Sequence, residues 1–109
     1  MALHHAASGE VVCLLLGATA APDMQSTAIF KSEKLEVMRL MLAKGKTMPA
    51  HQVAGDITIH CLWGSIDLCV EDQPRTLAAG SLVYLGGGVV HSLTASEDAC
   101  VLVHVVLQG

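Results

Sequence analysis

The feature that most constrains the fold of this chain is a series of short apolar segments, each five to nine residues long, separated by glycine-rich or polar turns. β-Branched residues are frequent in these segments, and several segments alternate apolar with polar positions, as half-buried strands do. Many short strands at regular spacing are typical of sandwiches and barrels. The sequence therefore predicts an all-β protein. The segments expected to form strands are 35–43, 57–63, 66–71, 81–85, 89–95 and 100–107.

The length of 109 residues predicts a single domain. Residues 35–109 contain all the predicted strands and form the barrel domain, and residues 1–34 are expected to be an arm or strand that packs on it. The apolar run 11–21 looks like the centre of a signal peptide, but no Lys or Arg precedes it and Glu10 lies beside it. The run is also too short to span a bilayer. We therefore expect a cytoplasmic protein.

Charged side chains are scarce, and this limits what the surface can bind. Only 15% of the residues are charged, while 52% are hydrophobic. Such a chain is expected to cover some apolar surface with another chain, and a symmetric homodimer is the commonest arrangement. The formal net charge is −4, and Lys and Arg form no cluster. Nucleic acids and anionic membranes are bound through such clusters, so neither is an expected partner.

The four cysteines, Cys13, Cys61, Cys69 and Cys100, form no C-x-x-C pair. Zinc knuckles and redox dithiols use such pairs, so neither is expected. The simplest interpretation is that all four are small, buried, reduced side chains of a cytoplasmic protein.

Two sets of glycines and histidines occur at fixed spacings. Gly45 is followed by His51 and then Gly64, and Gly80 is followed by Gly88 and His91. These spacings resemble the two sequence motifs of the small cupins, a family of short β-barrels, over residues 35–107. Several spacings that agree in order are more specific than one short motif. The resemblance implies a cupin-like antiparallel β-barrel, also called a double-stranded β-helix.

The resemblance also implies metal ligands, and two of them are missing. A cupin typically holds its metal with two histidines and a glutamate from the first motif and one histidine from the second. Here the second histidine position is Val53 and the glutamate position is Ile57, so His51 and His91 remain. Two imidazoles do not fill the coordination of Fe, Mn, Ni or Zn, which take three or more protein ligands. The residues fit a weakly held divalent metal and a site without metal equally well.

His60 is the candidate for a third metal ligand. The alternation of a strand argues against it: if Ile57 faces the interior, Ile59 and Cys61 do as well, and His60 points outward. A bulge after Gly55 would reverse this assignment, because one extra residue exchanges the two faces of a strand. Ile57, Ile59 and Cys61 are therefore expected to line an apolar ligand pocket. His60 is either a ligand or an outward-facing residue.

Two functions remain compatible with these residues, beside a purely structural dimer whose pocket is vestigial. The first is binding, in which a degenerate cupin pocket with His51 and His91 at its open end holds a small ligand or a weakly held divalent metal. The second is a metal-dependent enzyme resembling cupin dioxygenases or isomerases, since a metal with open positions binds substrate. In both cases we expect His51, at the start of a strand, to lie close to His91, which follows the turn 86–88.

Overall fold

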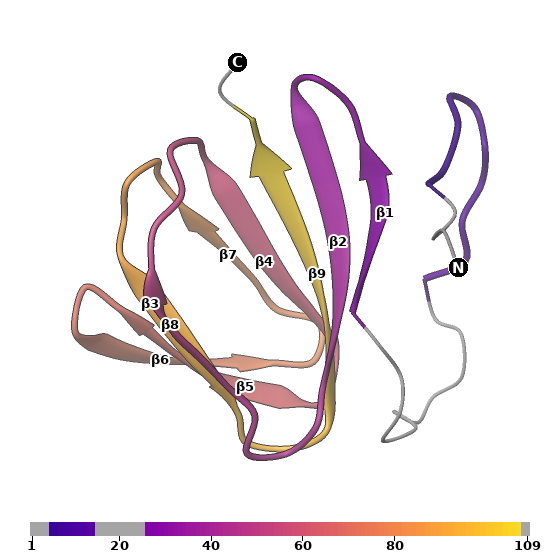
Figure 1. Cartoon of the computed structure of the whole chain (residues 1–109). Coiled ribbons are helices and arrows are strands. Elements are labelled where there is room, and N and C mark those ends of the chain that lie inside the picture. The colour runs from indigo at the N-terminus through magenta and orange to yellow at the C-terminus, as the bar shows by residue number, and fades with distance from the viewer. Residues whose placement is uncertain (1–4, 15–25, 108–109) are drawn as a thin grey trace.

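The computed structural model describes residues 5–14 and 26–107, and over these residues the chain forms strands and turns but no helix. Nine strands in this part of the chain form two antiparallel sheets that face each other (Figure 1). The five-stranded sheet has the order β1–β2–β9–β4–β7, and the four-stranded sheet has the order β3–β8–β5–β6. The strands are β1 (Thr27–Lys31), β2 (Leu35–Leu42), β3 (Thr47–His51), β4 (Ile57–Trp63), β5 (Ser65–Val70), β6 (Gln73–Ala78), β7 (Leu82–Leu85), β8 (His91–Ala95) and β9 (Ala99–Val106).

The all-β prediction is confirmed, and the six predicted segments are strands whose ends differ from the prediction by no more than two residues. Three further strands, β1, β3 and β6, lie at sheet edges. Pro49 in β3 and Pro74 in β6 fit such positions, because an edge strand leaves half of its N–H groups unpaired. β1 falls within the predicted arm 1–34 and pairs with β2, so the sheet extends into that segment.

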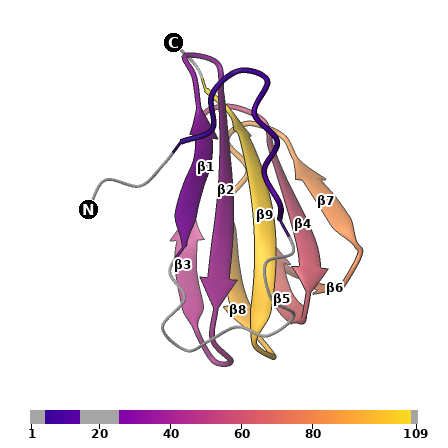
Figure 2. The ribbon, with the colours of Figure 1, turned by 90° about the vertical axis from the view of Figure 1, so that its right-hand side faces the viewer.

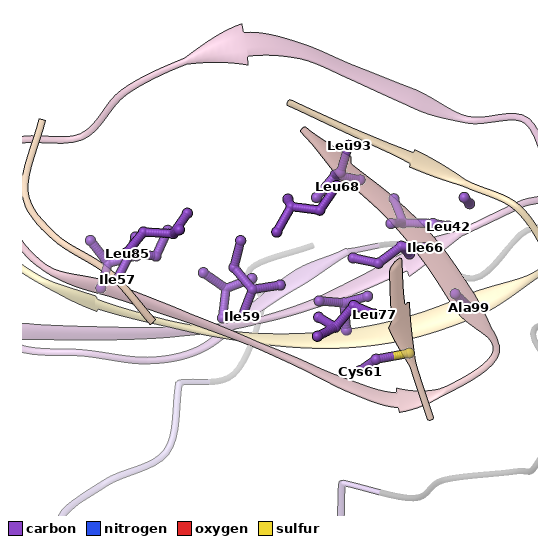
Figure 3. Close-up of a cluster of buried hydrophobic side chains, with 14 residues drawn as sticks. Leu42, Ile57, Ile59, Cys61, Ile66, Leu68, Leu77, Leu85, Leu93 and Ala99 are labelled. Carbon is purple, nitrogen blue, oxygen red and sulfur yellow. The ribbon is translucent and has the colours of Figure 1, made fainter. Parts of the chain in front are cut away.

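The two sheets enclose a core of aliphatic side chains (Figure 3). β4 shows how the sequence places side chains in this core. Ile57, Ile59 and Cys61 are 5%, 2% and 0% exposed, while the residues between them are half-buried. This alternation is the period of a strand with one face in the core. The other buried members of the core are Leu42, Ile66, Leu68, Leu77, Leu85, Leu93, Ala95, Ala99, Val101, Val103 and Val105.

A single residue, Gly64, joins β4 of one sheet to β5 of the other. Its φ is +84°, a conformation that glycine adopts readily and other residues rarely do. A Cβ at this position would also overlap the carbonyl oxygen of Asp98 and lie 2.6 Å from the Cα of Ala99. The sharp passage between the sheets therefore requires glycine, which explains why a glycine closes the first motif.

The described N-terminal residues lie over the outer face of the five-stranded sheet, as Figure 2 shows for the indigo segment. The amide of Ala6 donates to the carbonyl of Ile29 in β1 at 2.8 Å. Arg39 on β2 reaches the carbonyl oxygens of Cys13 and Leu14, each at 3.5 Å. Most of the apolar run 11–21 falls in residues 15–25, outside the described part of the chain. No helix in the described residues is long and apolar enough to cross a membrane.

The prediction that all four cysteines are buried is wrong for two of them. Cys61 and Cys100 are buried, but Cys13 is exposed and Cys69 is half-buried. Cys69 alternates with core residues of β5 and so faces outward, while Cys13 lies on the N-terminal segment rather than in a sheet. All four are free thiols in the structure.

Candidate functional site

The structure brings the rings of His51 and His91 together at one end of the barrel. His51 is the last residue of β3 and His91 is the first of β8, and the two are partners in the antiparallel register. Their ring centroids are 4.5 Å apart, and the ring planes are tilted by 55°. The expectation that His51 begins a strand is wrong. The proline-containing segment before it, which has few apolar residues, is itself a strand.

A β-bulge puts both histidines on the same face. Met48 pairs with Leu93, His51 pairs with His91, and the register shifts between these pairs. Without that shift, Met48 and His51 would point to opposite faces, because they are three residues apart. Pro49 is one of the two residues within the shift, where an N–H group is not needed. The bulge therefore positions His51 beside His91.

The two rings differ in their exposure. His91 is 3% exposed and is the buried polar residue among the described residues, while His51 is exposed. The buried positions of β8 alternate, so His91 lies on the face that carries Leu93 and Ala95 into the core. The pair thus connects the barrel interior to solvent, with one imidazole inside and one at the surface.

Both imidazoles are held in the same tautomer. Nδ1 of His51 lies 3.1 Å from the carbonyl oxygen of Pro49, and Nδ1 of His91 lies 3.0 Å from that of Val89. A carbonyl oxygen only accepts, so Nδ1 is the donor in each ring. In the neutral rings both Nε2 atoms then carry a free lone pair. A metal-binding histidine commonly has this arrangement, with one nitrogen oriented by a backbone carbonyl and the other free to bind.

Two loops at this end of the barrel are bonded to each other. The amide of Gly88 donates to the carbonyl of Val53 at 2.8 Å, and the amide of Gly87 donates to Oδ1 of Asp56 at 3.1 Å. A Cβ on Gly87 would overlap the carbonyl oxygen of Ala54, so the glycine turn permits this close approach. The loops that follow His51 and precede His91 are therefore fixed relative to each other.

His60 is not brought to the pair. It is half-buried on β4, between Leu82 of β7 and Leu102 of β9, and it alternates with the core residues Ile59 and Cys61. No group of three His, Cys, Asp or Glu residues in the described chain could hold a metal ion. Within this part of the chain, His51 and His91 thus have no third ligand of those types.

The three apolar residues expected to line a pocket are packed in the core. Ile57 begins β4, which the loop 52–56 joins to His51, and Ile59 and Cys61 lie progressively further along the strand. A hollow of about 340 Å³ adjoins His91, and these three residues do not line it. Its walls include Cys69 and Ser92, which face away from the core. The hollow therefore lies mainly on the outer side of the four-stranded sheet.

Comparisons with known proteins agree with this architecture. The sequence model of the family described as "Cupin domain" matches residues 38–106. No curated protein matches the chain. Similar solved structures include a conserved protein of unknown function from Streptococcus pyogenes, with a TM-score of 0.81 and 21% identity over 97% of this chain and 94% of that one.

Two further structures extend the comparison. A cupin superfamily protein from Desulfitobacterium hafniense has a TM-score of 0.76 and 16% identity, over 83% of this chain and 84% of that one. KdgF from a Halomonas species has a TM-score of 0.71 and 18% identity, over 84% and 86% of the two chains. At these identities the likeness concerns the fold alone.

Proposed function

Because this chain belongs to the cupin-domain family, we propose that it binds a small ligand or a metal ion through the Nε2 atoms of His51 and His91. The observation that supports this most strongly is the shared tautomer: both Nδ1 atoms are occupied by backbone carbonyls, which leaves both Nε2 lone pairs for a ligand. Two rings that only packed against each other would not need the same nitrogen bonded to a backbone carbonyl.

The free lone pairs limit the chemistry of the ligand. An Nε2 atom without a proton accepts hydrogen bonds or binds a cation, so an organic ligand must present a donor such as a hydroxyl or ammonium group. The side chains of Val53 and Val89 are partly buried against the core at this end of the barrel, and they suit an apolar remainder of such a ligand. A small amphipathic molecule with a donating head group fits both conditions.

A metal-dependent enzyme, dioxygenase- or isomerase-like, is the alternative. The two histidines supply two protein ligands, and the positions at which cupins carry the others are Val53 and Ile57. A divalent ion held by two imidazoles and water would bind weakly. Stoichiometric metal in protein purified without a tag, together with turnover of a substrate, would favour the enzyme over the binding protein.

Metal binding to single-residue variants tests the proposal. Equilibrium dialysis of the metal-free protein against Zn²⁺, Ni²⁺ and Co²⁺ should give a measurable affinity that falls at least tenfold in His51→Ala, because one of two ligands is lost. His51 is exposed, so this variant is expected to fold. His60→Ala, which removes a histidine from the outer face of β4, is the matched control and should leave the affinity unchanged.

A second measurement tests the tautomers directly. Long-range ¹H–¹⁵N correlation spectra, recorded with both imidazoles neutral, should show both rings protonated at Nδ1. Added ligand should shift the Nε2 resonances of His51 and His91. Equal losses of binding in His51→Ala and His60→Ala, or rings protonated at Nε2, would contradict the proposal.

A further inference from the structure

We infer that the ion this histidine pair selects is monovalent copper, Cu(I), with the thioether of Met48 as the third ligand. The inference rests on the proposed function, because it names the ion bound by the same two Nε2 atoms. It depends on three features of the described residues: the position of Met48, the separation of the rings and the absence of charge among the donors.

Met48 lies on the inner face of β3, next to the pair. It is partly buried against the core cluster, so its side chain points into the barrel. Its register partner Leu93 is on the same face of β8 as His91, two residues further along, which makes Met48 the diagonal neighbour of His91. Diagonal neighbours in an antiparallel pair are about 7–8 Å apart at Cα, within reach of a long side chain.

The separation of the rings fits an ion bound by both Nε2 atoms at a bent N–metal–N angle, which leaves room for a third ligand. A metal bound about 2 Å from each Nε2 lies roughly 3 Å from each ring centroid, so two rings in line across one ion are ~6 Å apart. The observed separation is 4.5 Å, and the planes are tilted. One ion can therefore reach both rings only at an angle well below 180°, which leaves one side of the ion open. Met48 is the inward-facing residue of β3 that precedes His51 in the register with β8, so its thioether is the donor we assign to this side.

The three donors carry no charge, and this favours a monovalent ion. The cost of moving an ion out of water rises with the square of its charge, so a divalent ion loses about four times as much hydration free energy as a monovalent one. Ile57 stands at the position where a cupin has its glutamate, so the anionic ligand of the family is missing. Oδ1 of Asp56 accepts a hydrogen bond from the amide of Gly87. A thioether is a soft ligand that selects Cu(I), whereas imidazole suits several metals.

Competition with a chromogenic Cu(I) chelator under anaerobic, reducing conditions tests the inference. We expect the unmodified protein to bind one Cu(I) at least tenfold more tightly than Zn²⁺. Met48→Leu, which conserves the volume of the side chain, should weaken Cu(I) binding at least tenfold and leave Zn²⁺ binding unchanged. Met41→Leu is the matched control, because Met41 pairs with Cys100 on the outer face of β2 and β9. It should change neither affinity.

Copper X-ray absorption adds a structural readout. A sulfur ligand should appear in the spectrum of the unmodified protein and of Met41→Leu, and disappear in Met48→Leu. If Met48→Leu binds Cu(I) normally, or if Zn²⁺ binds as tightly as Cu(I), the inference is overturned. The His51→Ala variant then still tests the proposed function separately. Loss of metal binding in this variant supports the proposed function, and unchanged metal binding overturns the proposed function too.

Discussion

Gly64 is a residue whose replacement should destabilise the fold. Gly64→Ala would place a methyl group against the backbone of Asp98 and Ala99, and it would hold a non-glycine residue at positive φ. We expect a loss of about 3 kcal/mol or more in the free energy of unfolding, measured by urea denaturation.

Gly80→Ala is the matched control for this prediction. Gly80 has a similar φ of +85°, but nothing lies within 4 Å of its missing Cβ. Its replacement should cost only the backbone strain, about 1 kcal/mol. Equal losses in the two variants would show that the close approach at Gly64 is unimportant.

The two buried thiols should make the free energy of unfolding depend on pH in the alkaline range. Burial raises the pKa of Cys61, with smaller contributions from Cys100 and Glu97. Burial also raises the pKa of Cys100, opposed by Arg39. Above the usual value of 9.0 the unfolded thiols lose protons that the folded thiols keep, so the free energy of unfolding falls as pH rises. The loss should be at most about 1.4 kcal/mol per pH unit for each thiol.

Urea denaturation between pH 8 and pH 11 would measure this dependence. Lys and Tyr titrate in part of the same range, so the decisive quantity is the difference in slope between the unmodified protein and Cys61→Ala/Cys100→Ala. Cys13→Ala, which removes an exposed thiol, should keep the original slope. An unchanged slope in the double variant would contradict the prediction.

Among the strands and turns, the hairpin β5–β6 has the clearest backbone strain, at two non-glycine residues with positive φ. Val70 pairs with Gln73, so Glu71 and Asp72 form a two-residue turn in which both have positive φ, 49° and 66°. These angles are typical of a type I′ turn, in which Asn-Gly is the favoured pair. Glu71→Asn/Asp72→Gly should therefore stabilise the protein by about 1 kcal/mol and raise Tm by roughly 5 °C in calorimetry.

The reversed pair, Glu71→Gly/Asp72→Asn, is the control for turn geometry. It introduces the same residue types in the order that type I′ turns favour less, so its stabilisation should be smaller. If both double variants lower Tm, the acidic side chains of this turn make contacts that outweigh the backbone strain.

The elements differ in how much of them the sequence predicts. For β4, the sequence predicts both the ends of the strand and the side chains that face the core. Ile57, Ile59 and Cys61 occupy alternate positions, and all three are buried in the core. β3 was not predictable, since its residues TMPAH include one proline and few apolar positions, and it gains stability from pairing with β8 rather than from its own pattern. Edge strands of this kind lack a periodic signal.

The site was predictable in part for the same reasons. The resemblance to cupins implies that His51 and His91 lie close together, as they do in the structure. The bulge after Met48 and the carbonyl partners of the two Nδ1 atoms depend on backbone geometry, which no residue pattern specifies. The metal and ligand roles of His51, His91 and His60, and the ligand contacts of Ile57, Ile59 and Cys61, stay predictions.

At the scale of the whole molecule, we expect a homodimer that covers the outer face of β4 and β7. Tyr84 and Leu82 are 60% and 57% exposed on this face, beside the half-buried His60. Burying such side chains against a second copy is favourable, by about 25 cal/mol for each Å² of apolar surface. Sedimentation equilibrium at micromolar concentration should give the mass of two chains.

Tyr84→Lys should convert this dimer to monomer, because a charged side chain would be buried at its centre. Thr76→Lys places the same charge on the exposed outer face of β6, in the other sheet, and should remain dimeric. A monomer mass for the unmodified protein, or a dimer that survives Tyr84→Lys, would refute this arrangement.

The central place of β9 has a consequence for how the protein is made. β9 is the last strand of the described residues, yet it lies between β2 and β4 in the middle of the five-stranded sheet. On a translating ribosome, β2 and β4 must wait for residues 99–106 to emerge before they gain their common neighbour. Until then their apolar faces and free edges are exposed to chaperones and to other nascent chains. Closure of the barrel therefore waits until β9 has been synthesised, and a stalled chain that ends before β9 should remain sensitive to protease.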